Sequence, residues 1–503
     1  MDIKGTTPVV APSKEIDEGG AYSPSNSDSF YVEDGEKVDY NAAELRKLLW
    51  KLDLRVLPPI FLLWFLSFID RVNIGMARLG GLEKDLNMKG NDFNVALCIF
   101  FAPFILFEIP FNMILKKIKP SVWLPVQNFL LALFTIGEGV VRTKEGLWAM
   151  RFLVGFFEAG LVPGSIFLLS AYYARFDLQW RLNMLIVGNA VASAFGGLLA
   201  FAISSMSGEE GYLGWRWVFI IEGSVTAVVS LLCIFFVVSW PDEAEWLSDH
   251  ERALIKTRIR EQAGEFRMDR LDMAALKRCL LDWKVWLSTA IYIGTICSTY
   301  SISLFSPTII KELNPHYSGR HVQILTVPIF IASAAVTLIS AIASDKARHR
   351  YGFAMFGYLI TLIGLAMFFA QEHLSPRALY GALFLISIGT YICLPLVWTM
   401  CVNNISGYWK NSIASALCVG FGNAGGIVAS CIFVTKQAPH YWTGFRVDFG
   451  LTSAAAVLTT ALLVGLIFEN RKRARGGRDY RLERSADEVA NLGDDHPRFR
   501  YVY

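Results

Sequence analysis

Long apolar runs separated by short polar connections fill most of the chain. Residues 1–45 differ, because they are rich in Ser, Gly, Asp and Glu and lack apolar periodicity, so we expect a disordered tail there. From Leu54 onward, each apolar run has the roughly 20 residues that a helix needs to cross a hydrocarbon core of about 30 Å. The pattern predicts an all-α membrane protein with twelve transmembrane helices. The expected spans are 54–77, 92–114, 121–140, 147–174, 183–206, 216–240, 284–310, 321–343, 352–371, 377–401, 411–434 and 447–469.

A long charged break after the sixth apolar run divides the chain into two halves of six helices. A glycine and asparagine pattern at 188–197, in the fifth run, resembles a pattern at 422–426, in the eleventh, which supports two related halves. Glycines at such places let helices approach closely in lipid. The predicted domains are a cytosolic N-terminal tail at 1–45, a six-helix bundle at 46–240, a cytosolic central loop at 241–283, a second six-helix bundle at 284–470 and a cytosolic C-terminal tail at 471–503.

Composition and charge place the chain in a lipid bilayer and give no support to a nucleic-acid partner. Of the 503 residues, 54% are hydrophobic and only 18% are charged, which is too apolar for an ordinary soluble enzyme. The net charge is +3, and Lys and Arg gather at the termini and in the 2/3, central and 8/9 loops, where they mark membrane orientation. Both termini are therefore predicted to be cytosolic, although the 1/2 loop also carries Arg78, Lys84 and Lys89.

The first helix carries two charges inside the membrane. Its uncharged run from Val56 to Ile69 holds 14 residues, about 21 Å of helix, which is too short to cross. The helix therefore has to continue through Asp70 and Arg71, where each charge costs roughly 2.5–3.5 kcal/mol unless it faces a cavity or a partner. Neighbours in sequence do not face each other on a helix, so each needs a partner elsewhere. A functional cavity is favoured over a structural charge network.

The fourth helix offers partners for these charges. Arg151 and Glu158 are seven residues apart and therefore share one face of a helix. Two carboxylates and two guanidiniums in a low-dielectric cavity form a coupled titrating system. An incoming carboxylate can take an arginine from its internal acid, which then accepts a proton more readily, so the pattern favours symport of an anion with protons. A purely structural bridge between the first and fourth helices is the alternative.

The remaining polar residues of the apolar runs give weaker signals. Glu108, near the cytosolic end of the second helix, Glu138 and Glu222 are interpreted as gate or packing residues. Helices 7 to 11 have no acid in their interiors, so the second half should offer neutral contacts, among them Tyr300 and Asn423. All seven histidines fall in polar stretches or at segment ends, so no metal site or cofactor is predicted and proton coupling has to use carboxylates.

Four stretches carry a resemblance to a known family. They are 70–77 (Asp-Arg-Val-Asn-Ile-Gly-Met-Ala), 151–164, 214–223 and 422–426. With them, the chain resembles the anion:cation symporter branch of the major facilitator superfamily, and within it the fungal allantoate permease group. The resemblance covers about Leu54 to Phe468. It implies the major facilitator fold, two six-helix bundles around a central site with alternating access between them.

The resemblance also implies roles for individual residues. Arg71 looks like the arginine that grips a substrate carboxylate, and Asp70, Arg151 and Glu158 look like its proton-linked network. Residues 344–350 resemble the superfamily's cytosolic gating motif, whereas the corresponding 2/3 loop at 115–120 lacks the expected Asp. The candidate substrate-binding residues are Arg71, Arg151, Asn73, Tyr300 and Asn423; the candidate proton-coupling residues are Asp70 and Glu158; the candidate gating residues are Glu108, Asp345 and Arg348.

Proton-coupled uptake of a small organic carboxylate across the plasma membrane is therefore the leading hypothesis, with nicotinate, pantothenate, biotin and allantoate as the anions that the resemblance suggests. Export of a metabolite or drug by proton antiport uses the same charges and remains the first alternative. A nutrient sensor without transport is the second alternative. No nucleophile, base and orienting group occur at usable spacing, so an enzyme is not predicted. The resemblance favours a monomer.

Overall fold

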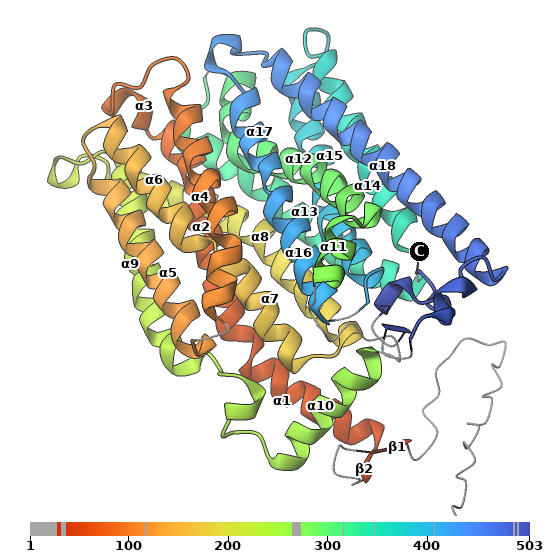
Figure 1. Ribbon diagram of the computed structural model, residues 1–503. Coiled ribbons are helices and arrows are strands. Elements are labelled where there is room, and N and C mark those ends of the chain that lie inside the picture. Colours follow the sequence, from red (N-terminus) through yellow and green to blue (C-terminus); the bar gives the residue numbers. More distant parts are fainter. Residues whose placement is uncertain are drawn as a thin grey trace, which may run out of the picture.

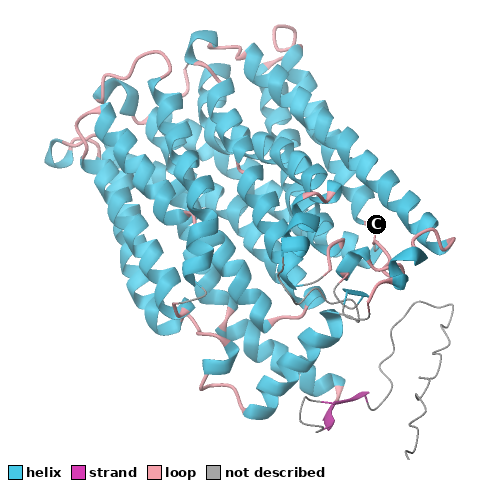
Figure 2. Ribbon diagram, in the orientation of Figure 1, coloured by secondary structure: helices cyan, strands magenta, loops and turns pink. Residues whose placement is uncertain are grey.

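The computed structural model describes residues 28–31, 37–115, 118–263, 273–314, 316–347, 349–406, 408–485, 488–489 and 492–502. Helices make up nearly all of it (Figure 2), as the hydrophobic pattern predicts. Eleven of them are long and apolar enough to cross a membrane. Helix α4 (Asp92–Leu115), with 24 residues, packs among these and brings the total in the described part of the chain to the predicted twelve.

The twelve spanning helices form two bundles that lie side by side (Figure 1). The first bundle contains α2 (Leu57–Leu79), α4, α5 (Pro120–Val140), α6 (Lys144–Glu158) with α7 (Leu161–Tyr172), α8 (Arg175–Ile203) and α9 (Gly214–Phe236). The second contains α12 (Trp283–Leu313), α13 (Gly319–Ala347), α14 (Arg350–Phe369), α15 (Pro376–Asn403), α16 (Tyr408–Gly422) with α17 (Ala424–Ile432), and α18 (Trp442–Ala474).

Smaller elements mark the two ends of the bundles. Helices α1 (Ala42–Arg55) and α10 (Asp249–Ala263) lie together at one end, at the bottom of Figure 1, and we call this end the terminal side. The short helix α3 (Leu82–Asp85) lies at the opposite end, the far side. The chain also forms the antiparallel strands β1 (Asp28–Tyr31) and β2 (Lys37–Tyr40), helix α11 (Met273–Leu280) in the central loop, and short 3-10 helices in connecting segments and in the C-terminal segment.

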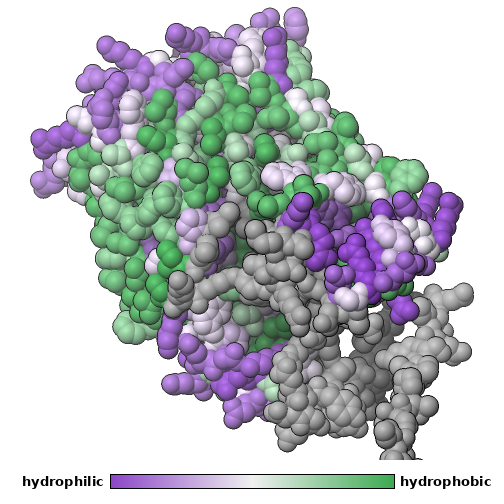
Figure 3. All heavy atoms as spheres, viewed as in Figure 1, coloured by the Kyte–Doolittle hydropathy of each residue, from purple (hydrophilic) through white to green (hydrophobic). Residues whose placement is uncertain are grey.

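The surface has the polarity of a membrane protein. Figure 3 shows a broad apolar zone between polar ends. Large apolar side chains of the spanning helices are exposed, among them Leu106 of α4, Phe235 of α9 and Phe468 of α18. Water gives no reason for such residues to face outward in so wide a zone, whereas the acyl chains of a bilayer do. The apolar zone therefore marks the part of the molecule that lies in lipid.

Two spanning segments that the sequence predicts as continuous helices are interrupted. The fourth breaks between α6 and α7 at Ala159–Gly160, and a Cβ added at Gly160 would lie 2.4 Å from the Gln127 amide nitrogen. The eleventh breaks between α16 and α17 at Asn423. Interrupted helices in membrane proteins expose backbone groups where they line a cavity, so both breaks point to the space between the bundles.

Contacts between the bundles close the far side. The Asn94 amide of α4 donates to the carbonyl oxygens of Ser430, at 2.5 Å, and Phe433, at 3.1 Å. Arg78 Nη2 donates to Thr435 Oγ1 at 3.1 Å. These bonds join the far ends of α2 and α4 to the segment around the end of α17, so the far side of the molecule is closed.

The structure also describes parts of both predicted tails. In the N-terminal tail, β1 and β2 pair as a hairpin, and residues 1–27 and 32–36 lie outside the described part. Helix α18 runs to Ala474, past the predicted end of the second bundle. The segment after it folds back, so that the buried Asp494 carboxylate lies 2.5 Å from Lys284 Nζ and 2.8 Å from Lys410 Nζ. Local composition misses this because the partners lie 84 and 210 residues away.

Candidate functional site

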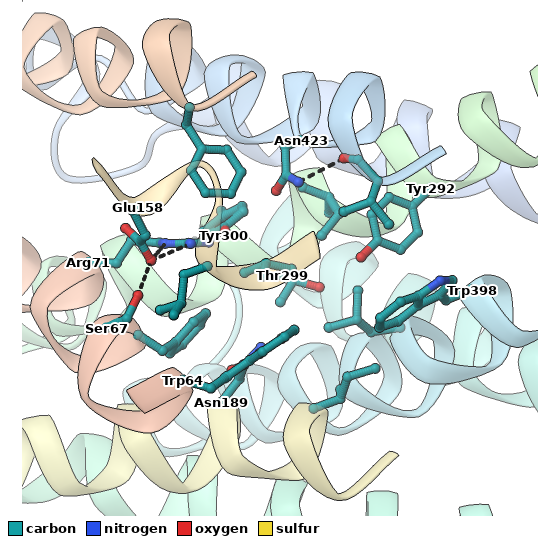
Figure 4. Close-up of a pocket in the computed structure, with 18 residues that line it drawn as sticks. Trp64, Ser67, Arg71, Glu158, Asn189, Tyr292, Thr299, Tyr300, Trp398 and Asn423 are labelled. Carbon is teal, nitrogen blue, oxygen red and sulfur yellow. Dashed lines mark hydrogen bonds and ion pairs between the residues drawn. The ribbon is translucent and has the colours of Figure 1, made fainter. Parts of the chain in front are cut away.

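A cavity lies between the two bundles, and both contribute to its wall (Figure 4). Its two charged residues, Arg71 and Glu158, stand together at one end, and Tyr292 and Trp398 stand at the other. Uncharged side chains cover the rest. The lining residues are Trp64, Ser67, Phe68 and Arg71 of α2, Phe104 of α4, Glu158 of α6, Leu161 and Val162 of α7, Ile186 and Asn189 of α8, Tyr292, Ile296, Thr299 and Tyr300 of α12, Leu394 and Trp398 of α15, Val419 of α16 and Asn423.

Arg71 and Glu158 form an ion pair in the wall of this cavity. Arg71 Nε and Nη2 donate to Glu158 Oε1 at 3.0 and 2.5 Å, and the Ser67 hydroxyl donates to the same oxygen. Arg71 Nη1 donates to the Tyr300 hydroxyl across the bundle interface. Glu158 Oε2 is buried and has no hydrogen-bond partner among the described residues. One carboxyl oxygen thus accepts all of these hydrogen bonds, and the other accepts none from the described residues.

Aromatic rings enclose the Arg71 guanidinium. Its carbon atom lies 4.8 Å from the ring centre of Phe104, 5.4 Å from that of Phe100 and 5.6 Å from that of Phe68. Ring faces attract a cation while they exclude water. The guanidinium is consequently held in a desolvated position, where it attracts an anion far more strongly than an arginine in water does.

Close helix packing holds this pair in place. A Cβ added at Gly155 of α6 would lie 2.1 Å from the backbone oxygen of Phe100, so only glycine lets α6 approach α4 this closely. Gly75 of α2 faces the backbone oxygen of Leu304 on α12 in the same way, at 2.6 Å. Gly155 and Gly75 therefore let α6 pack closely on α4 and α2 pack closely on α12, which fixes the helices that carry Glu158 and Arg71.

A second group of buried charges lies behind the cavity, inside the first bundle. Arg151 Nη2 is 2.8 Å from Glu138 Oε2, which joins α6 to α5. Asp70 is within electrostatic reach of Glu138, Arg151 and Glu222, and none of these four residues lines the cavity. The carboxyl oxygens of Asp70 and Glu222 are buried without a hydrogen-bond partner in the described part of the chain. This group holds three acids and one base.

The structure places the predicted substrate-binding residues in two groups. Arg71, Tyr300 and Asn423 line the cavity, with the Asn423 amide donating to the Val419 carbonyl at 2.7 Å (Figure 4). Arg151 lies behind the cavity, in the second group of charges. Asn73 is fully buried and faces α8, where a Cβ added at Gly196 would lie 2.9 Å from its Oδ1.

The predicted proton-coupling and gating residues are also separated. Glu158 lines the cavity, whereas Asp70 lies behind it. Glu108 is buried at the bundle interface, where a Cβ added at Gly420 of α16 would lie 3.0 Å from its Oε2. The side chain of Asp345 and all of Arg348 lie outside the described residues.

Sequence reasoning missed two polar pairs. Trp64 Nε1 donates to Asn189 Oδ1 at 2.7 Å in the cavity wall, a contact across 125 residues. Asp448, at the start of the predicted twelfth helix, is buried, and the Ser298 hydroxyl of α12 donates to it at 2.5 Å. The sequence does give one signal for Asp448, which is the second residue of the predicted span 447–469. An acid so close to the end of a predicted helix is easily interpreted as a loop residue.

A comparison with known families decides the class of protein. The family model described as Major Facilitator Superfamily matches residues 60–430, which include almost all of the first bundle, the second bundle as far as α17, and every lining residue of the cavity. The chain belongs to the major facilitator superfamily. The site is thus the central cavity of a superfamily transporter, and the fold class and the family resemblance predicted from the sequence are confirmed.

Similar superfamily proteins come from fungi. The chain is 32% identical to an uncharacterized transporter of Schizosaccharomyces pombe over 93% of this chain and 92% of that one. It is 32% identical to the MFS transporter prlL of a fungal species, over 88% and 92%. It is 26% identical to the high-affinity nicotinic acid transporter of Saccharomyces cerevisiae, over 91% and 85%. All three relatives are named as transporters.

A solved structure shows the same fold at low sequence identity. A bacterial homolog of the human lysosomal transporter Spinster, in an inward-facing and occupied conformation, aligns with a TM-score of 0.57 at 15% identity, over 84% of this chain and 96% of that one. The alignment extends over both bundles, and at this identity it bears on the fold alone. The chain is therefore a multi-pass membrane transporter built on the major facilitator fold.

Proposed function

We propose that this transporter imports a small organic carboxylate together with protons. The observation that carries the proposal is Arg71, the one basic side chain among the described lining residues of the cavity. Its Glu158 partner holds it through a single oxygen, and aromatic rings shield the pair from water. A carboxylate offers a guanidinium two oxygens in a matching plane, which favours it over a neutral substrate.

Binding of the anion and uptake of a proton are coupled through Glu158. A substrate carboxylate that takes over Arg71 leaves Glu158 as an uncompensated charge in a desolvated wall, and a buried charge without a partner is costly. Glu158 then accepts a proton, for which its Oε2 is free of hydrogen bonds in the described structure. The proton is the coupling ion, and no other cofactor is needed.

An excess of buried acids supports this coupling. The described spanning helices of the first bundle bury five acids and four arginines. Two of these arginines, Arg181 and Arg216, pair with Asp53 and Asp85 at helix ends, which leaves two bases for the five acids. Ionising all five would leave three uncompensated charges at low dielectric, so some of these acids carry protons. The five acids are Asp70, Glu108, Glu138, Glu158 and Glu222, and the two bases are Arg71 and Arg151.

Orientation and compartment complete the proposal. We assign the terminal side to the cytosol and the membrane to the plasma membrane, with a monomer as the working unit. Basic loops favour the cytosol, and a relative named as a nicotinic acid transporter favours carboxylate uptake. In this assignment the contacts of Asn94 and Arg78 close the extracellular side.

Uptake measurements test the proposal. Labelled nicotinate, pantothenate, biotin and allantoate are offered at pH 5 and pH 7.5 to transporter-deficient cells that express the wild type, Arg71→Ala, Glu158→Gln or the control Arg446→Ala, whose arginine is exposed. We expect one anion to accumulate faster at pH 5. Arg71→Ala should abolish uptake, Glu158→Gln should remove its pH dependence, and Arg446→Ala should behave as the wild type.

Two outcomes contradict carboxylate import. If Arg71→Ala transports at the wild-type rate, the guanidinium does not hold the substrate. If none of the four anions enters at either pH while the protein reaches the cell surface, export by proton antiport becomes the better explanation, and efflux from preloaded cells then decides that question.

A further inference from the structure

Two thiols from different bundles face each other near the far side of the molecule. Cys98 of α4 and Cys431 of α17 have their Sγ atoms 2.9 Å apart. Both are free thiols; Cys431 is exposed and Cys98 is partly exposed. A disulfide bond is about 2.0 Å long. An approach of less than about 1 Å therefore converts this contact into a covalent link between the bundles.

Other contacts fix how closely the two helices approach. The Asn94 amide, one helical turn before Cys98, donates to the carbonyl oxygens of Ser430 and Phe433. A Cβ added at Gly426 would lie 2.3 Å from Phe101 Cε1, so the backbone of α17 rests directly on that ring. The thiols are thus brought together by bonds and packing that do not depend on them, in the conformation with the far side closed.

We propose that Cys98 and Cys431 are an oxidative modification site, and that their disulfide holds the far side of the transporter closed. The co-reactant is a two-electron oxidant of the peroxide class. The thiolate of one cysteine attacks a peroxide oxygen and the O–O bond breaks, which gives a sulfenic acid and hydroxide; the hydroxide takes up the proton that the thiol released and becomes water. The second thiol attacks that sulfur and releases another water, so hydrogen peroxide gains two electrons and two thiols become one disulfide.

The disulfide stops the transport cycle because of where it lies. Alternating access requires the far ends of the two bundles to separate while the terminal ends approach. Cys98 belongs to the first bundle and Cys431 to the second, so a bond between them resists that separation. Reduction restores two thiols and frees the helices.

The other cysteines allow a clean test. Cys98 and Cys233 are the two cysteines that precede residues 264–272 of the central loop, and the other six follow those residues. Cys401 and Cys418 are neighbours, but both belong to the second bundle. Cleavage of the central loop at these residues therefore leaves the halves joined only if a disulfide links Cys98 or Cys233 to one of the six later cysteines.

The full chain is given a protease recognition sequence between Ala263 and Met273, purified, treated with hydrogen peroxide, cleaved and run on a denaturing gel. We expect the wild-type halves to stay joined without reductant and to separate with dithiothreitol. Cys98→Ser and Cys431→Ser should each separate in both lanes. The matched control Cys233→Ser, which changes a buried thiol of the same bundle, should behave as the wild type.

Hydrogen exchange then tests the closed far side without any substrate. Oxidation should slow amide exchange at residues 92–98 of the wild type and leave Cys98→Ser unchanged. Wild-type halves that separate after oxidation, or Cys98→Ser halves that stay joined, overturn the disulfide. A disulfide that forms without slowing exchange overturns its role as a lock. Neither readout uses the carboxylate substrate, so these results stand apart from those of the proposed function.

Discussion

Arg71 is held by contacts that only a guanidinium makes at once. Its Nε and Nη2 donate to Glu158, its Nη1 donates to Tyr300, and its plane lies among aromatic rings. Lysine keeps the charge but is a point donor without the planar fork. In the proposed function, a lysine at position 71 would therefore pair less well with the substrate carboxylate. Weakening that buried ion pair costs about 3 kcal/mol, which lowers the affinity for the substrate roughly a hundredfold.

We therefore expect Arg71→Lys to raise the KM for the transported anion about a hundredfold, by the same argument, at unchanged surface expression. The measurement is the concentration dependence of uptake, with Arg446→Lys as the control on an exposed arginine. A wild-type KM for Arg71→Lys would mean that the site needs a positive charge and no particular geometry.

Sequence reasoning reaches some residues of the site and misses others for a physical reason. The 14-residue run before Asp70 is too short to span, which is enough to place Arg71 in the membrane. Spacing on a helix also puts Arg151 and Glu158 on one face. It does not set the rotation of that helix against its neighbours, and the structure divides the two, with Glu158 on Arg71 and Arg151 on Glu138.

Among the helices, α4 and α6 meet through a glycine rather than through side chains. A Cβ at Gly155 would lie 2.1 Å from the Phe100 backbone oxygen, and backbone cannot move aside as a flexible side chain can. Gly155→Ala should therefore separate the two helices and lower the unfolding temperature of the purified transporter by about 1–3 °C, which for a chain of this length corresponds to the 1–3 kcal/mol typical of overpacking.

The chain provides a matched control in Gly352 of α14, where an added Cβ meets no atom within 4 Å. Gly352→Ala should leave the unfolding temperature unchanged or raise it slightly, because alanine is the better helix former. Fluorescence-detected unfolding in detergent compares the two variants. Equal unfolding temperatures for both would show that α6 tolerates a methyl group there, and that Gly155 does not set the distance between α4 and α6.

Hydrophobic periodicity alone predicts the number of helices, because each crossing needs a long apolar run regardless of its neighbours. It does not predict the breaks at Gly160 and Asn423, since both segments remain apolar through the break. The breaks depend on close approach to other helices, as at Gly160 against Gln127. Such approaches are properties of the packed bundle.

At the scale of the whole molecule, the C-terminal segment stabilises the terminal side of the second bundle. Asp494 is fully buried between Lys284, at the start of α12, and Lys410, in α16. Burial alone would raise the pKa of the Asp494 carboxyl, but the two ammonium groups hold it below its usual range. A lowered folded-state pKa stabilises the fold above the unfolded-state pKa of about 4. The stabilisation is lost only as pH falls from there.

Asp494→Asn removes this charge at every pH and leaves Lys284 and Lys410 with Asp282, which lies 3.2 and 2.7 Å from their Nζ atoms. Breaking a buried ion pair costs about 3–5 kcal/mol, so we expect the variant to unfold well below the wild type at pH 7. The control is Asp495→Asn, whose partly exposed carboxylate pairs with Arg481 at 3.1 Å and should contribute little to stability.

The difference in stability between wild type and Asp494→Asn should be constant from pH 7 to pH 5 and narrow below about pH 4, because the carboxyl of the unfolded wild type then takes up a proton. Equal stability of Asp494→Asn and Asp495→Asn at pH 7 would contradict a stabilising role for this segment and leave the second bundle independent of the chain beyond α18.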